Sequence, residues 1–532
     1  MTEQGIIDFI NKNNYDIRVH HNARWIDQKC TPDVLCIVAD CIVNYIDNIK
    51  CIKELSFSFP LEAGIYAITG ENGSGKSTLI SCASSVFYQM PMTVFFGRPN
   101  NASIEFSLGT ATRKWFFKEQ IWSAESSQEK MLINGFYEGS IIFGNRFQDT
   151  KLSIISILDK LKMADLCPAA PFIKKNLGLI LHNDESYYNN LCIINKQVSD
   201  EMGLTRVTYC NITEDNTLVS QPRMSTGENL LISILSSLNV LYKKRKRYHD
   251  GRPYIVFLDE IELALHSSAL RRLILFLKDF ASSFNLSIFF STHSIELLRE
   301  IKAQNIYYLS IAFNGAIMVT NPCYPAYATR NLYGDDGYGN DLVVLVEDDL
   351  AKIVIEKILI SKKIAQSIRI KILPTGGWTN TITMAYDVTT SNLLQKGTKI
   401  AVILDQDIKS DVPDFISSHK QFSGIKIDYL PIPSLEKFLR NKLVITPDAD
   451  FFSLLDTYLF QKRPLQEILL SYKRDNKKDS DGKSLYGYLL NEIRSMRKDR
   501  EDLVDLVVRY ILDNDINSIN TLADYLRRKI EE

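Results

Sequence analysis

A run of glycine, lysine and serine from Gly70 to Ser77 (GENGSGKS) contains the residue types that hold phosphate groups. Because Gly70, Gly73 and Gly75 carry no side-chain bulk, successive backbone N–H groups can converge on an anion at the start of a helix. Lys76 then reaches the β- and γ-phosphates, and the Ser77 hydroxyl is a ligand for Mg²⁺. The run predicts an ATP-binding loop.

The neighbouring residues supply the elements that such a loop needs. The β-rich run 65–69 (IYAIT) leads directly into the glycines, and residues 78–82 continue as a helix. We expect Asn72 and Thr78 to contact the nucleotide as well. A chance glycine turn would not have this strand, loop and helix around it.

Two carboxylates follow the apolar run 254–258 (YIVFL). A buried strand ending in this way can hold Mg²⁺ with Asp259 and polarise the attacking water with Glu260. Alone, the pair would be weak evidence; after a phosphate loop it predicts ATP hydrolysis.

Two further runs carry a family resemblance. Met224–Glu228 (MSTGE) resembles the signature of ABC ATPases, and Ser291–Ser294 (STHS) closes a β-rich run where these enzymes have their switch histidine. The resemblance to ABC and SMC-like ATPases covers about residues 45–320. Without it, the first run would be an ordinary helix cap and the histidine a structural residue.

This resemblance implies roles for four residues and an oligomeric state. Ser225 and Gly227 would meet the γ-phosphate of a nucleotide bound by a partner subunit, and His293 would touch the γ-phosphate of its own. Gln148, in the run GNRFQ, would be the Q-loop glutamine, with a plain surface residue as the alternative. A homodimer or higher homo-oligomer through the ATPase domains is therefore expected.

Carboxylates also end two β-rich runs in the second half of the chain. Glu347 closes the run 343–347, and Asp405 and Asp407 follow the run 400–404. These runs alternate with helix-length segments, which predicts a parallel sheet with the three acids at its carboxyl edge. Oxygen ligands grouped there suit Mg²⁺ or Mn²⁺, although exposed Asp pairs are also common turn formers.

The pattern of Glu347, Gly376-Gly377 and Asp405-Gln-Asp407 is similar to a TOPRIM domain over about residues 341–435. A TOPRIM domain after an ABC-type ATPase, together with Glu262-Leu-Ala-Leu-His266, resembles the OLD (overcoming lysogenization defect) family. Its members are DNA nucleases, with relatives in antiphage systems such as Gabija and certain retrons. The resemblance implies that Glu347, Asp405, Asp407 and Glu436 are metal ligands and that Lys483 stabilises transition-state charge. Ala351 stands where many OLD proteins have a second acid.

Composition restricts the class of protein. Hydrophobic residues make up 45% and charged residues 23%, as in soluble globular enzymes, and the net charge is −1. A DNA site must therefore be a local patch, and the basic run 243–247 is either such a contact or a solvated loop. The nine cysteines form no Cys-x-x-Cys pair, and no signal peptide or membrane span is expected. These features indicate a cytoplasmic protein.

The expected fold is α/β: an ABC-type P-loop ATPase domain, a small parallel-sheet TOPRIM domain and a helical C-terminal region. We expect the following division: a helical N-terminal extension at 1–48, with a helix over 33–46; the ATPase at 49–325; a linker at 326–341; the TOPRIM domain at 342–445; and helices at 446–532.

The sequence thus predicts an ATP-regulated, metal-dependent DNA endonuclease, the effector of an antiphage system. Its partners would be DNA and a defence protein, either a reverse transcriptase with its non-coding RNA or a helicase-like protein. A non-cutting DNA clamp or scaffold resembling SMC or RecF proteins is the alternative. The nucleotide-binding subunit of a transporter would leave residues 341–532 unexplained.

Overall fold

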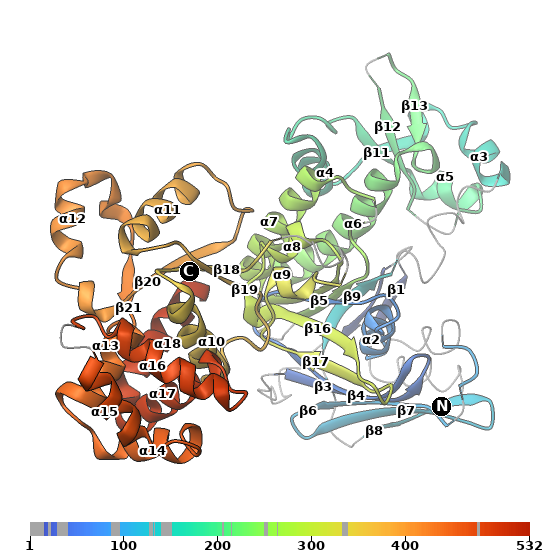
Figure 1. Ribbon diagram of the computed structural model, residues 1–532. Coiled ribbons are helices and arrows are strands. Elements are labelled where there is room, and N and C mark those ends of the chain that lie inside the picture. Colours follow the sequence, from blue (N-terminus) through green and yellow to red (C-terminus); the bar gives the residue numbers. More distant parts are fainter. Residues whose placement is uncertain are drawn as a thin grey trace. The chain divides into compact units, whose positions relative to one another are not determined.

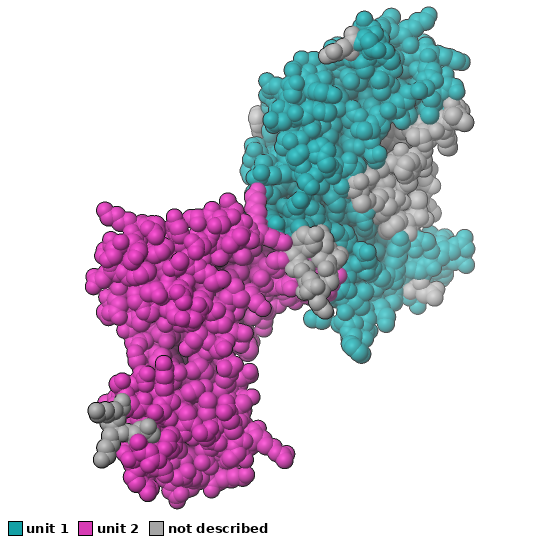
Figure 2. Space-filling view, turned by 45° about the horizontal axis from the view of Figure 1, so that its top comes forward, with its two compact units in different colours: residues 1–323 teal, residues 324–532 magenta. Residues whose placement is uncertain are grey.

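The chain forms two compact units, residues 1–323 and 324–532 (Figure 2). The computed structural model describes residues 15–19, 23–28, 41–86, 96–99, 101–126, 131, 133–139, 152–204, 207–213, 215–248, 254–262, 264–331, 339–475 and 479–531, with the backbone alone over 15–28. In the described part of the chain, no helix is long and apolar enough to cross a membrane.

An eight-stranded sheet is the centre of the first unit (Figure 1). In spatial order its strands are β1 (Tyr15–Val19), β2 (Ala23–Gln28), β9 (Asn134–Glu138), β14 (Tyr254–Leu258), β15 (Leu286–Ser291), β5 (Gly64–Gly70), β16 (Ile306–Ile311) and β17 (Ile317–Thr320). The five strands from β9 to β16 are parallel. The residues of β14 and β15 are buried on both faces, as expected for central parallel strands.

A second, antiparallel sheet packs against this one. Its strands, in spatial order, are β4 (Ile52–Pro60), β3 (Cys41–Ile49), β6 (Ser103–Leu108), β7 (Ala111–Lys118) and β8 (Ile121–Ser126). Helix α2 (Lys76–Ser84) lies between the two sheets, and all three share one hydrophobic core (Figure 1). This packing fixes the start of α2, where the phosphate loop ends.

The expected helical extension before residue 49 is wrong where the structure describes it. Residues 15–19, 23–28 and 41–49 are strands. In Cys41–Ile49 the burial alternates residue by residue, and Ile42, Asn44 and Ile46 face the core. Because its apolar residues fit a period of two as well as 3.6, pairing with β4 and β6 decides the outcome.

The rest of the first unit consists of helices and a small antiparallel sheet. The sheet order is β10 (Leu166–Pro168), β11 (Leu191–Ile194), β12 (Tyr209–Ile212), β13 (Leu218–Ser220). The helices are α3 (Leu152–Leu158), α4 (Pro171–His182), α5 (Lys196–Glu201), α6 (Thr226–Tyr248), α7 (Ser267–Phe284) and α8 (Ile295–Leu298). The basic run 243–247 is the end of α6 rather than a loop, and Arg245 donates to the Phe284 and Asn285 carbonyls.

The second unit is built on the parallel sheet that the sequence predicts. Its strand order is β19 (Ile370–Pro374), β18 (Leu342–Val346), β20 (Lys399–Leu404), β21 (Ile427–Tyr429), and every neighbouring pair is parallel. Short connections and helices link the strands: α10 (Asp349–Ser361), α11 (Trp378–Thr390) and α12 (Val412–Ser418); α13 (Leu435–Arg440) follows β21. All carboxyl ends therefore lie at one edge.

The helical C-terminal region is not separated from this sheet by a boundary at residue 445. Its helices are α14 (Ala449–Leu459), α15 (Leu465–Asp475), α16 (Lys483–Ser495), α17 (Arg500–Asn514) and α18 (Ile516–Glu531). They share one hydrophobic core with β18, β20, α10 and α13. Tyr525 of α18 also accepts a hydrogen bond from the Val402 N–H of β20.

The expected linker begins inside the second unit. Helix α9 (Pro325–Ala328) is held there by the buried Asp341 carboxylate, which accepts the N–H groups of Ala326 and Tyr327 at 2.8 and 3.1 Å. The unit therefore starts at Tyr324, and residues 332–338 lie outside the described part of the chain.

Candidate functional site

The phosphate loop joins β5 to α2 and needs its glycines. Gly70, Gly73 and Gly75 all have positive φ angles of 149°, 81° and 91°. A Cβ atom on Gly70 would lie 2.2 Å from the Leu309 carbonyl oxygen of β16, so no other residue fits there. Asn72 and Gly73 are exposed at the tip of the loop, whereas Thr78 is buried in α2.

Lys76 lies folded over this loop. Its Nζ donates to the carbonyls of Gly70 and Glu71 at 3.1 and 2.9 Å, and the residue is 6% exposed. Burial lowers the pKa of its ammonium group, while the carboxylates of Glu260 and Asp259 act in the opposite direction. A phosphate would supply the negative charge that this buried cation needs.

Asp259 lies at the carboxyl end of β14, beside the loop. Ser291 Oγ donates to its Oδ1 at 2.6 Å, and the Ser77 hydroxyl is within hydrogen-bonding reach. Burial, together with the charges of Glu260 and Glu262, raises the pKa of Asp259 to about 6. Among the described residues, nothing hydrogen-bonds its buried Oδ2. This oxygen and the Ser77 hydroxyl are a donor set that fits Mg²⁺.

Glu260 and His293 complete the group around the loop. Glu260 has φ 51°, a strained value for glutamate, and its N–H donates to Ser291 Oγ at 2.7 Å. The N–H of His293 donates to Glu262 Oε1 at 2.7 Å. Burial and the nearby Lys76 charge lower the pKa of His293 to about 4, so its imidazole is neutral at pH 7. The structure thus brings the residues from all three strand ends together.

The signature run starts helix α6. Ser225 N–H and Oγ–H both donate to Glu228 Oε2 at 2.7 Å, and Glu228 N–H donates back to Ser225 Oγ at 3.2 Å. A Cβ on Gly227 would approach the Ala264 carbonyl oxygen to 2.8 Å. This helix start opens into a cleft of about 770 Å³. Gln148 lies outside the described residues.

Glu347 and Asp405 meet at the carboxyl edge of the second unit's sheet. The Asp405 N–H donates to Glu347 Oε1 at 2.8 Å. The Glu347 carbonyl accepts the N–H groups of Gly376 and Gly377, which fixes the turn after β19. Asp405 is 7% exposed, and burial with the charges of four carboxylates raises its pKa to about 8. These four are Glu347, Asp348, Asp407 and Glu436.

The other two predicted ligands lie at the same edge. Asp407 forms an ion pair with Lys437 through Oδ2, while nothing described here hydrogen-bonds its buried Oδ1. Burial and the Asp348 charge raise the pKa of Glu436, and the Lys483 charge lowers it. Gly482, with φ 81°, lets this segment approach, since a Cβ there would lie 2.2 Å from the Glu436 carbonyl oxygen. The structure therefore brings Lys483 close to Glu436.

These acids fit a cation in part. Their number and the orphaned Asp407 oxygen favour one, because clustered carboxylates repel one another without it. Within the described residues, however, no three His, Cys, Asp or Glu side chains have the arrangement of a finished metal site. Lys437 forms an ion pair with Asp407, so the lysine side chain would have to move before Asp407 could bind a cation. Ala351 is buried in the core, and no acid replaces it there.

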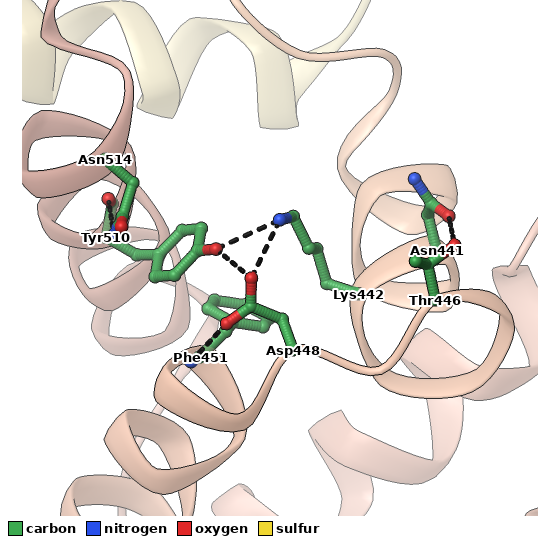
Figure 3. Close-up of polar contacts among 7 residues, drawn as sticks. All are labelled: Asn441, Lys442, Thr446, Asp448, Phe451, Tyr510 and Asn514. Atoms are coloured by element: carbon green, nitrogen blue, oxygen red, sulfur yellow. Dashed lines mark hydrogen bonds and ion pairs between the residues drawn. The ribbon is translucent and has the colours of Figure 1, made fainter.

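Helix α13 carries Glu436 and Lys437, and a polar triad fixes the segment that follows it. Lys442 Nζ donates to Asp448 Oδ2 and to the Tyr510 hydroxyl at 2.9 and 3.0 Å, and Tyr510 donates to Asp448 (Figure 3). Asp448 Oδ1 also caps α14 through the Phe451 N–H. These hydrogen bonds lower the pKa of Asp448 to about 2. The triad ties α13 to α14 and α17.

Sequence reasoning missed residues that act through the predicted ones. Ser291 bridges Asp259 and Glu260, and Lys437 pairs with Asp407. Tyr188 donates to Glu228 beside the signature serine. No motif marks them, since each contact joins residues 30 or more positions apart.

Comparisons with known protein families give matches within the first unit. Residues 45–169 match a family model described as AAA domain, and residues 199–299 match one described as AAA domain, putative AbiEii toxin, Type IV TA system. No curated protein sequence matches the chain.

Three solved structures are similar at low identity. The SMC head domain from Thermotoga maritima has 13% identity and a TM-score of 0.30, covering 53% of this chain and 98% of that one. A Smc head domain bound to the C-terminal domain of ScpA, from Pyrococcus furiosus, has 11% identity and a TM-score of 0.34, covering 53% of this chain and 96% of that one. An ATP-binding cassette of an ABC transporter has 13% identity and a TM-score of 0.25, covering 52% of this chain and 89% of that one. By the two family matches, residues 45–169 and 199–299 of the chain are similar to AAA domains.

Proposed function

We propose that this protein is an ATP-regulated, metal-dependent DNA endonuclease whose cutting site is the acidic edge of the second unit. The observation that carries the proposal is the convergence of Glu347, Asp405, Asp407 and Glu436 at the carboxyl end of one parallel sheet. Burial, together with the repulsion between Asp405 and its neighbouring carboxylates, raises the pKa of Asp405 to about 8. A divalent cation relieves this repulsion and suits oxygen ligands.

In this proposal the chain's own residues hold the metal and the phosphate. Glu347, Asp405 and Asp407 bind a Mg²⁺ or Mn²⁺ ion, which would activate water for attack on a phosphodiester. The Lys483 charge acts on Glu436, and the exposed Lys483 ammonium group, which pairs with Asp481 at 3.8 Å, would turn to a DNA phosphate. With Ala351 in the core, Asp348, whose charge acts on Asp405, is the candidate ligand for a second ion.

ATP turnover would control the cut rather than make it. Ser77, Asp259, Glu260 and His293 form one half of an ATPase site, and the signature of a second copy supplies the other half. A homodimer or higher oligomer follows. Resemblance to OLD nucleases supports a role in antiphage defence, with a reverse transcriptase and its RNA or a helicase-like protein as partner.

A cleavage assay tests the nuclease proposal. The full chain should nick supercoiled plasmid with Mg²⁺ or Mn²⁺ and lose this activity in chelator. Glu347→Gln should abolish nicking, because it removes one ligand charge, whereas Asp387→Asn should not. Asp387 is an exposed acid of α11 in the same unit and serves as the matched control. Equal nicking by Glu347→Gln and wild type would sink the proposal.

A non-cutting, ATP-driven DNA clamp or scaffold is the second candidate. It is favoured by the Lys437–Asp407 ion pair, which places an internal cation where a metal ligand is expected. The buried Ala351 adds to this. A clamp would bind DNA in an ATP-dependent way, would not bind Mn²⁺ at Asp405 and would leave plasmid uncut; titration of Mn²⁺ into wild type and Asp405→Ala separates the two candidates.

A further inference from the structure

We propose that Tyr188 is a positioning residue for ATP hydrolysis, which holds the signature residue Ser225 in place through Glu228. The inference rests on the proposed pairing of two copies, because Ser225 would act on a nucleotide bound by the partner. Nothing in the sequence motifs marks Tyr188, which lies between α4 and β11, about 40 positions before the signature.

The contacts form a short chain. The Tyr188 hydroxyl donates to Glu228 Oε1 at 2.7 Å. The other carboxylate oxygen, Oε2, accepts both the N–H and the Oγ–H of Ser225 at 2.7 Å. Since one carboxylate serves both ends, the position of Tyr188 sets the orientation of the Glu228 side chain and, through it, the rotamer of Ser225.

Tyr188 is itself rigidly held. It is 1% exposed, and its carbonyl accepts the Leu191 N–H at 3.0 Å. His182 Nε2 lies 3.3 Å from the Tyr188 hydroxyl, and the ring of Tyr187 stacks on His182 with centroids 3.6 Å apart. A buried phenol fixed in this way can hold the half-buried Glu228 side chain in one orientation.

The network opens toward the place where a ligand would arrive. The cleft of about 770 Å³ is lined by Tyr187, Tyr188, Ser225, Gly227 and Glu228, while Glu228 is only half-buried. Without the phenol hydroxyl, Glu228 Oε1 loses its donor, and the carboxylate can turn toward water. Ser225 would then lose its fixed rotamer.

The consequence is a loss in turnover rather than in nucleotide binding. The P-loop, Asp259 and His293 bind nucleotide within one copy and do not touch Tyr188. Removing the hydroxyl should therefore lower kcat for ATP and leave KM nearly unchanged.

A matched pair of variants tests this. Tyr209 is also buried, at 6% exposure, and its hydroxyl pairs with Ser236 Oγ at 2.8 Å further along the same helix α6. Tyr188→Phe should lower the ATPase kcat about tenfold with KM and analogue affinity within about twofold. Tyr209→Phe should keep kcat within about twofold of wild type. Similar kcat values for the two variants, or a parallel loss of nucleotide affinity in Tyr188→Phe, would overturn the proposal.

A coupling experiment separates positioning from general stability. If Tyr188 acts through Ser225, then Tyr188→Phe should have no further effect on kcat in a Ser225→Ala background. Multiplicative losses would contradict the proposal. Wild-type ATPase activity per subunit should rise with protein concentration; a flat profile refutes the paired site itself. Plasmid cleavage is a separate readout, so failure of the nuclease proposal leaves these outcomes distinct.

Discussion

The backbone N–H of Asp405 donates to Glu347 Oε1 over 2.8 Å, joining the ends of β20 and β18. This bond holds the Glu347 carboxylate against the end of β20, which carries the Asp405 carboxylate. Because both lie half-buried or buried at an edge with Asp407, the ionised form of Asp405 is disfavoured and its pKa rises to about 8. The geometry of the fold thus crowds these carboxylates together, which supports the proposed metal site.

This charge cluster predicts a pH-dependent stability of the metal-free protein. The pKa of Asp405 rises from 3.8 to about 8, so between these values the folded chain binds more protons than the unfolded chain. Stability should therefore fall as pH rises through this window. In chelator, Asp405→Asn should melt higher than wild type by on the order of 5 °C at alkaline pH, with no difference near pH 4. Parallel melting curves at all pH values would contradict this.

Lys437 should compete with the cation for Asp407. Lys437→Met removes that competing charge, so Mn²⁺ should bind about two- to fivefold more tightly, a modest gain because the ion pair is partly exposed. Lys357→Met is the control, since it breaks a similar ion pair with Asp505 at 3.0 Å elsewhere in the unit. Titration followed by the paramagnetic signal of free Mn²⁺ measures both. Weaker binding in Lys437→Met would mean that the lysine supports the site.

Much of the fold near the sites follows from local sequence. The glycines at 70, 73 and 75 require positive φ angles, and the alternating runs from Val343 to Leu430 predict the parallel sheet that the structure contains. Because parallel strands end at one edge, the gathering of Glu347 and Asp405 could also be predicted.

What could not be predicted depends on contacts far apart in the chain. Cys41–Ile49 fits a helical period until β4 and β6 pair with it. The partners of the site residues, such as Lys437 and Tyr188, belong to no motif and are brought in by tertiary packing. The sequence of the helices after residue 446 also did not predict that they share one hydrophobic core with β18 and β20.

Ser291 should matter for ATP hydrolysis beyond its packing. Ser291→Ala removes a hydroxyl that donates to Asp259 Oδ1 and accepts from Glu260 N–H, so ATPase kcat should fall about tenfold. Ser287→Ala is the matched control: it is equally buried on β15 and donates to the Glu62 carbonyl at 2.8 Å. Both variants should lose about 1–2 kcal/mol of stability. A loss of kcat shared by both would show a general effect of the strand.

The most direct measurement of the central claim compares DNA cleavage and ATP hydrolysis in the same samples of wild type and Asp405→Asn, each with Mg²⁺. We predict that Asp405→Asn reduces plasmid nicking at least about 100-fold while its ATPase rate stays within about twofold of wild type. If Asp405→Asn nicks DNA as fast as wild type, or if wild type cuts nothing in any divalent cation, the acidic edge is not a nuclease centre.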